Sequence, residues 1–347
     1  MTGASDTTRV LFRLACFLPV VAAPFLTNWI CTAPPVQRWL ARDSDGFADM
    51  LIAGKTIWTS DDLRTLKAAW IARMPAGKDV LILGSSRALP IASEWFQPLS
   101  MFNAAVFSGD MDDMISIFQL CLEAGKTPRV VVLELNPALT NEAKAGEQRA
   151  LEPYFRHALA RYGFRPPLRL WSELVSALQF RLNLRRLQSP AWGVSKKPVP
   201  GATRLLPDGV PEYTLEQSSP SPDLVQASVV LSISNFDRGY IPWRTKSQPD
   251  AYDLRLFRRF LDDLQSRGIS VIVWLAPVHP AAYDFYAKLG GYDETWIRRE
   301  MASRNITVVG SYSPAVARAT KADFFDDIHP RAGIVHRLFK EAGVIQQ

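Results

Sequence analysis

Short apolar runs alternate with amphipathic stretches in two parts of this 347-residue chain, and this alternation restricts the fold more than any other feature. Runs of about five residues that end in Gly or polar residues are typical of strands buried on both faces. Strands separated by helices predict a parallel sheet with helices on both faces, so we expect a three-layer α/β fold. The expected strands lie at 79–83, 101–106, 129–135, 269–275 and 305–309, and the expected helices at 60–73, 112–124, 253–267, 296–303 and 331–342.

The composition is that of an ordinary globular protein, with 48% hydrophobic and 21% charged residues. These values exclude a disordered chain, a collagen-like fibre and a polytopic membrane protein. Three Cys are too few for a disulfide framework of the small secreted kind. The sequence contains no P-loop, no dinucleotide-binding fingerprint and no zinc-ligand spacing, so we expect neither a cofactor nor a metal.

An apolar run at 14–31 departs from this average composition. Arg13 precedes it, and if Arg13 extends its charge to the interface the apolar segment covers 10–31, enough for one transmembrane helix. Pro24 argues against a buried amphipathic helix, and it also follows directly the small residues that signal-peptide cleavage would need. A cleaved signal peptide stays an alternative. Basic residues before the run predict a cytoplasmic amino end, which in a bacterium places the body on the periplasmic side of the inner membrane.

The rest of the chain divides into a membrane-proximal connector and one interrupted α/β domain. The connector covers 32–75 and the domain 76–345, with an insertion at about 140–250. Helical patterns occupy about 147–188 of the insertion. A Pro-, Ser- and Gly-rich segment at 189–223 follows and is expected to be a loop or a partly disordered excursion.

The insertion concentrates positive charge. Residues 149–204 hold eleven Lys and Arg but only two Glu, a local balance of +9 within a chain whose net charge is +6. For an exported body, an anionic glycan or anionic lipid headgroups are better partners than nucleic acid, which we do not expect. A solvated helix face with a buried aromatic side explains the same pattern.

Polar residues follow the predicted strands in a set that suits acyl transfer. Ser86 lies after the strand at 79–83, and Asp326 and His329 are spaced i, i+3 near the carboxyl end. A hydroxyl nucleophile needs a base within hydrogen-bond reach, and the base needs an orienting partner. We therefore expect Ser86 as the nucleophile, His329 as the base and Asp326 as the group that orients it. In the alternative interpretation, Ser86 belongs to a helix N-cap, Asp326 caps the last helix and His329 is a surface residue.

An acyl-transfer site also needs hydrogen-bond donors where negative charge develops. Candidates are the Asn136 amide, which could equally be a turn residue, and backbone groups of Ser108 and Gly109. Further candidates for contact with substrate, because they lie beside the nucleophile or after the strand at 269–275, are Ser85, Arg87 and His279.

Together these residues resemble the SGNH/GDSL hydrolase superfamily. The 84–87 segment (Gly-Ser-Ser-Arg) matches its first block with Ser86 in the nucleophile position, Asn136 matches the third, and 326–329 matches the Asp-x-x-His block. The second block departs from the pattern, because Ala105 stands where a Gly is usual and Gly109 is the nearest Gly. The Gly-Ser-Ser turn and the single anchor are most similar to the membrane-anchored branch, which includes the D-alanyl transfer protein of teichoic acid biosynthesis and the alginate acetylation proteins.

The resemblance implies a flavodoxin-like sheet and a membrane-anchored O-acyl esterase or O-acyltransferase. Its substrate would be an acylated glycan or an acyl donor of the cell envelope or extracellular polysaccharide. A multi-spanning membrane O-acyltransferase is implied as a partner. The alternative is a catalytically inactive envelope protein that binds glycan or scaffolds a polysaccharide assembly complex.

Overall fold

The computed structural model describes residues 44–59, 63–139, 151–165, 194–195, 203–212, 220–237 and 248–346. Among these residues, no helix combines the length and the apolar composition needed to cross a membrane. The predicted anchor at 10–31 lies outside the described residues, as do Ser60 and most of the helical pattern at 147–188.

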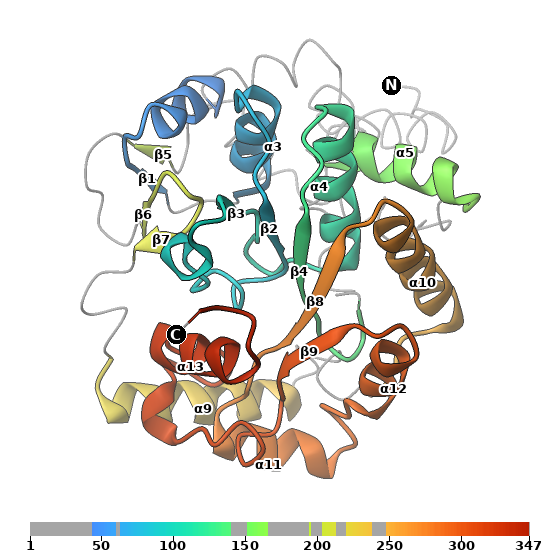
Figure 1. Cartoon of the computed structure of the whole chain (residues 1–347). Coiled ribbons are helices and arrows are strands. Elements are labelled where there is room, and N and C mark those ends of the chain that lie inside the picture. The colour runs from blue at the N-terminus through green and yellow to red at the C-terminus, as the bar shows by residue number, and fades with distance from the viewer. Residues whose placement is uncertain are drawn as a thin grey trace, which may run out of the picture.

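A five-stranded parallel sheet forms the centre of the protein (Figure 1). Its strands are β2 (Val80–Leu83), β3 (Met101–Asn103), β4 (Val130–Glu134), β8 (Ser270–Leu275) and β9 (Thr307–Gly310), in the spatial order β3-β2-β4-β8-β9. Each agrees with a predicted strand to within about two residues at its start, whereas β3 stops three residues before the predicted 106. The α/β class and the parallel sheet are therefore confirmed.

Helices connect and flank these strands. They are a helix at 44–52, α3 (Leu63–Arg73), η1 (Ser93–Phe96), α4 (Met111–Glu123), α5 (Glu152–Tyr162), α9 (Pro222–Asp237), α10 (Ala251–Ser266), α11 (Pro280–Lys288), α12 (Thr295–Ser303), η4 (Lys321–Asp323) and α13 (Ala332–Glu341). The N-cap of α13 is Arg331, so Asp326 does not cap the last helix.

The strand order places helices on both faces of the sheet. The chain crosses from β2 outward to β3 and then back over β2 to β4, after which it continues in that direction to β8 and β9. Because parallel crossovers are right-handed, η1 lies on one face and the later crossover helices on the other. The last helix, α13, joins η1: the Phe339 ring lies 6.4 Å from that of Phe96 and 5.3 Å from that of Trp274.

This order also places a topological switch point at the carboxyl edge of the sheet. The connections that leave the neighbouring strands β2 and β4 turn to opposite faces of the sheet. Such a switch point is where open α/β sheets bind their ligands.

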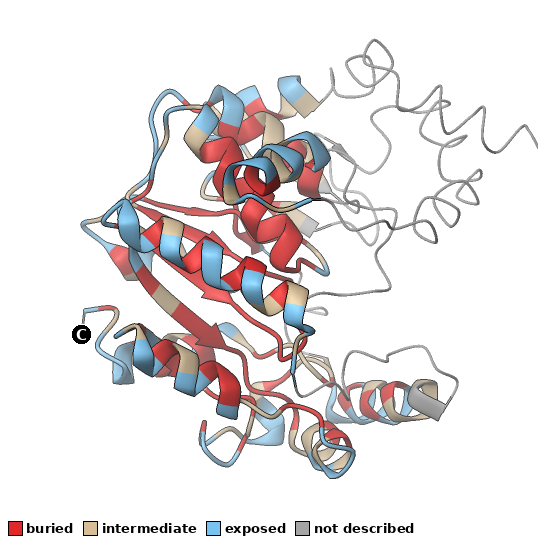
Figure 2. Ribbon diagram, turned by 90° about the vertical axis from the view of Figure 1, so that its right-hand side faces the viewer, coloured by how far each residue is buried: buried red, intermediate tan, exposed pale blue. Residues whose placement is uncertain are grey.

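The core lies between the sheet and its helices. Figure 2 shows the sheet as mostly buried, while each flanking helix exposes its outer side; β2 and β3 are buried along their whole length. Val131, Val132 and Leu133 of β4 are all fully buried. A run without polar alternation is what a strand covered on both faces requires.

A second, antiparallel sheet joins the connector to the insertion. The strand β1 (Ile57–Thr59) pairs with β5 (Val194–Ser195) and β6 (Thr203–Leu205), and β7 (Pro211–Glu212) pairs with β6. The prediction of a loop over the whole of 189–223 is therefore wrong for these three strands. Strands of two or three residues are too short to show a period, and β1, the partner of β5 and β6, lies more than 130 residues away.

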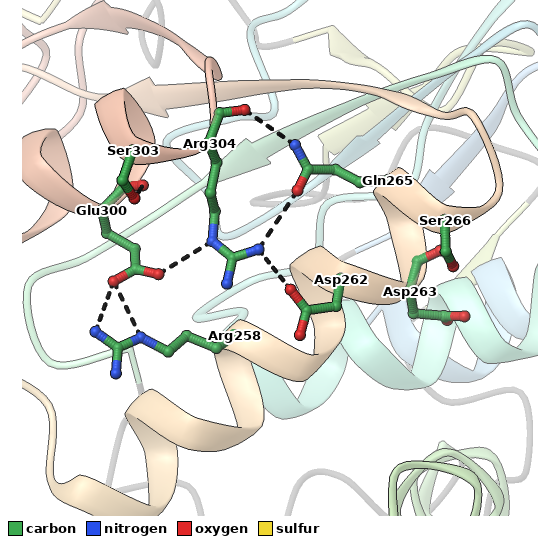
Figure 3. A network of polar contacts seen from close by, with 8 residues as sticks. All are labelled: Arg258, Asp262, Asp263, Gln265, Ser266, Glu300, Ser303 and Arg304. Carbon is green, nitrogen blue, oxygen red and sulfur yellow. Dashed lines mark hydrogen bonds and ion pairs between the residues drawn. The ribbon is translucent and has the colours of Figure 1, made fainter.

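An ion network ties α10 to α12 on the outer surface (Figure 3). The Glu300 carboxylate accepts hydrogen bonds from Arg258 Nη2 at 2.7 Å and from Arg304 Nε at 3.0 Å. Arg304 Nη1 also donates to Asp262 at 2.6 Å. These contacts fix the two helices that flank β8 and β9.

Candidate active site

The turn after β2 positions Ser86. Gly84 ends the strand with φ 155°, and a Cβ added there would lie 2.5 Å from the Glu134 Cβ. Only glycine allows β2 and β4 to approach this closely. The turn then continues through hydrogen bonds from the Ala88 N–H to the Ser85 carbonyl and from the Leu89 N–H to the Ser86 carbonyl. No helix follows directly, so Ser86 is not part of a helix N-cap.

A short loop before α13 positions His329. Phe324 and Pro330 form a β-bridge that closes the loop. Within it, Asp326 Oδ1 accepts the backbone N–H groups of Ile328 at 2.9 Å and His329 at 2.8 Å. Asp side chains favour such turns because they hydrogen-bond to backbone two or three residues ahead.

The two segments meet although 243 residues separate them. The Ser86 Oγ lies 2.7 Å from His329 Nε2, and His329 Nδ1 lies 2.6 Å from Asp326 Oδ2. A carboxylate on Nδ1 keeps the proton there, so Nε2 accepts the Ser86 hydroxyl. The side chains of His329 and Asp326 are 26% and 30% exposed, which leaves the site open to a substrate. This geometry is that of a hydroxyl nucleophile, its base and an orienting carboxylate.

Asp326 is ionised at neutral pH. Burial raises the pKa of its carboxyl, but the charge of His329 and the hydrogen bonds from His329 and Ile328 lower it more, so the pKa falls below its usual 3.8. A negative charge at this position can stabilise a protonated imidazole at His329.

Asn136 lies beside the turn that carries Ser86. β2 and β4 pair Leu83 with Leu133, so Ser86 and Asn136 each stand three residues beyond paired positions. Asn136 is 9% exposed, and its Oδ1 has no hydrogen-bond partner among the described residues. Within the same residues its Nδ2 makes no hydrogen bond either, which leaves that amide group free to act as a donor.

The second predicted turn contacts the first. A Cβ on Gly109 would lie 2.2 Å from the Gly84 carbonyl oxygen, so Gly109 packs directly on the nucleophile turn. Its own N–H donates to the Val106 carbonyl at 3.0 Å, however, and is not a free oxyanion donor. Ser108 has φ 49° and is exposed. In the described part of the chain, the N–H groups of Ser86 and Ser108 engage in no hydrogen bond.

The three candidate substrate contacts are buried. Ser85 and Arg87 are 7% and 3% exposed; the Ser85 backbone N–H donates to Glu134, and the Arg87 guanidinium forms an ion pair with Glu134. His279 is 1% exposed; it forms the N-cap of α11, and its N–H donates to the Asp327 carbonyl at 3.1 Å. Burial, together with the charge of Lys321, lowers the pKa of His279 despite the opposing Asp327 and Asp326. His279 thus supports the loop of Asp326 and His329 from behind.

Glu134 is the residue at this site that we did not predict from the sequence. It is the one charged side chain within the apolar run of β4, and it is 2% exposed. A carboxylate in a buried strand needs a partner, and this anomaly was the available signal.

Within the described residues, no group of three or more His, Cys, Asp or Glu side chains could hold a metal ion. A comparison of the sequence with protein-family models and with curated proteins gives no match. Function must therefore be argued from the geometry of the site.

Proposed function

We propose that this protein is a serine O-acyl esterase or O-acyltransferase of the SGNH type. The observation that supports this best is the hydrogen-bonded series Ser86–His329–Asp326, with its two distances of 2.7 and 2.6 Å. Ser86 follows β2, which lies next to β4 at the switch point of the sheet. This position agrees with the flavodoxin-like arrangement of such enzymes.

The proposed reaction has two steps. Ser86 Oγ attacks the acyl carbonyl while His329 Nε2 takes the hydroxyl proton, and Asn136 Nδ2 with the Ser86 and Ser108 amides stabilises the oxyanion. The tetrahedral intermediate collapses, the alcohol leaves with the proton from His329, and an acyl-Ser86 ester remains. Water or a sugar hydroxyl then attacks this ester, with His329 again as the base.

The substrate and the location rest on the sequence. We propose that the substrate is an acetylated glycan or an acyl donor of the cell envelope. The anchor at 10–31 would hold the α/β domain on the periplasmic side of a bacterial inner membrane. A multi-spanning O-acyltransferase would supply the acyl group. The mechanism assigns no cofactor.

The test uses p-nitrophenyl acetate hydrolysis and labelling by a fluorophosphonate, a probe that reacts with activated serines. We expect Ser86→Ala to abolish both signals, while Ser303→Ala on the distant helix α12 keeps them. Equal rates in the wild type and Ser86→Ala would reject the mechanism.

Hydrolysis and transfer are separated by adding an oligosaccharide with free hydroxyls, such as maltohexaose. A transferase releases p-nitrophenol faster and yields acetylated sugar, which mass spectrometry detects. An esterase yields only acetate.

One observation favours the inactive alternative, a glycan-binding or scaffolding protein. The Gly109 N–H is occupied by Val106, so one expected oxyanion donor is lost. That alternative predicts no fluorophosphonate labelling together with retention of the wild type and of Ser86→Ala on an immobilised glycan.

A further inference from the structure

A buried carboxylate joins the two residues on either side of the nucleophile. Glu134 Oε2 accepts the Ser85 N–H at 2.7 Å, and Glu134 Oε1 forms an ion pair with Arg87 Nη2 at 2.5 Å. The side chains of Glu134 and Arg87 are 1% and 3% exposed. Ser86 lies between these two points of attachment.

The rest of the turn is held by backbone hydrogen bonds. The Gly84 carbonyl accepts the Val106 N–H at 3.0 Å, and the Ser86 carbonyl accepts the Leu89 N–H at 3.3 Å. Among the described residues, the Ser86 N–H is left without a partner. The carboxylate thus fixes the turn without using the amide group that an oxyanion needs.

A gain in the stability of the fold does not explain why Glu134 and Arg87 are buried as an ion pair. Burying two charges costs about as much as their attraction returns, and apolar replacements of similar volume are often equally stable. A buried pair does, however, restrict the geometry of the groups that it joins. Arg87 also neutralises a negative charge that would otherwise oppose an oxyanion nearby.

We propose that Glu134, with Arg87, is a positioning residue that holds the Ser86 turn in its reactive geometry. This inference rests on the proposed function for its kinetic consequences. Its structural core, that the carboxylate restrains the segment 84–87, can be tested without activity.

The kinetic experiment compares Glu134→Gln, Glu134→Gln/Arg87→Met and, as a matched control, Glu300→Gln in the α10–α12 network. In Glu134→Gln, the side chain loses its charge, and its single amide oxygen cannot serve both the Ser85 N–H and the Arg87 guanidinium. We expect kcat for p-nitrophenyl acetate to fall about 10- to 100-fold with little change in KM, because small misplacements of a nucleophile have effects of this size. Glu300→Gln should keep the wild-type kcat.

The double variant separates positioning from stability. It removes both charges, so its thermal midpoint should return toward that of the wild type while its kcat stays at least about 10-fold lower. Recovery of kcat together with stability would overturn the proposal, because the effect of Glu134 would then be structural only.

Hydrogen–deuterium exchange provides the readout that is independent of catalysis. The Ser85 amide should exchange slowly in the wild type and at least about 10-fold faster in the double variant, since the hold on the turn is weakened. Unchanged exchange would overturn the proposal even in an active enzyme. Faster exchange in a protein that lacks Ser86-dependent activity would support the restraint and reject only the proposed function.

Discussion

Among the Glu–Arg groups of the described residues, two of similar chemistry lie in very different surroundings. In the network between α10 and α12, Glu300 is 12% exposed and its partners Arg258 and Arg304 are 47% and 17% exposed (Figure 3). Beneath the nucleophile turn, Glu134 and Arg87 are nearly inaccessible. At the surface, solvent screens the charges and can replace a lost partner. In the interior nothing replaces it, so the buried pair fixes one local geometry.

The largest effect is expected in the proposed catalytic series Ser86–His329–Asp326. Asp326→Asn should keep the shape of the loop but remove the charge that holds the His329 tautomer. We expect kcat for p-nitrophenyl acetate to fall by about 10³- to 10⁴-fold. The thermal midpoint should change little, because the carboxylate is partly exposed. A fall below tenfold would show that Asp326 does not orient His329.

The next largest effect tests the buried pair. Arg87→Met leaves the Glu134 charge buried without its cation, and we expect the free energy of unfolding to fall by about 3–5 kcal/mol. Arg258→Met, its counterpart at the surface, should cost at most about 1 kcal/mol. Urea unfolding of both variants measures the contrast, and equal losses would remove the distinction between the two groups.

Another buried basic side chain, that of Lys67, extends the comparison to pH. Lys67 is fully buried, and its Nζ donates to the carbonyl oxygens of Asn103 at 2.8 Å, Ala105 at 2.5 Å and Gly209 at 3.2 Å. Burial lowers the pKa of Lys67 from 10.5 to about 7, despite the charge of Asp208. The folded state therefore loses this proton near pH 7, whereas the unfolded chain keeps it to about pH 10.5.

Between these values the unfolded chain binds more protons, so stability should rise with pH, by at most about 1.4 kcal/mol per unit. This rise in stability ends near pH 9. Burial raises the pKa of Cys121 from 9.0 to about 12, so above pH 9 the unfolded chain loses the thiol proton before the folded state does, and this lowers the stability as the pH rises. Urea unfolding at pH 7, 8 and 9 measures this rise. Lys67→Met should be less stable and should lack it; parallel curves for the two proteins would contradict the assignment.

The smallest effect is expected at the surface. Glu300→Gln should lower the free energy of unfolding by about 1 kcal/mol or less, and added salt should shrink the difference from the wild type. Thermal unfolding at low and high ionic strength checks this. A loss as large as that of Arg87→Met would mean that the network is not screened.

The sequence was sufficient wherever a pattern is local. The apolar runs predicted all five strands of the central sheet, and the i, i+3 spacing predicted that Asp326 would reach His329, which it does at 2.6 Å. Periodicity and short spacings act through neighbouring residues, so they can be read directly. The burial of Ser85, Arg87 and His279 could not be predicted in this way, because burial depends on what packs against a residue and not on its neighbours in sequence. Their role as substrate contacts stays a prediction.

What the sequence by itself determined was the α/β class and the residues able to form the series Ser86–His329–Asp326. The tertiary structure decided the rest: that β1 pairs with strands of the insertion, that the Gly109 amide is occupied, and that Glu134 bridges Ser85 and Arg87. The physical reason is the same in each case. These contacts form only when the crossovers of the sheet bring together segments that are distant in sequence. A short-range pattern of residues does not indicate which distant segments will meet.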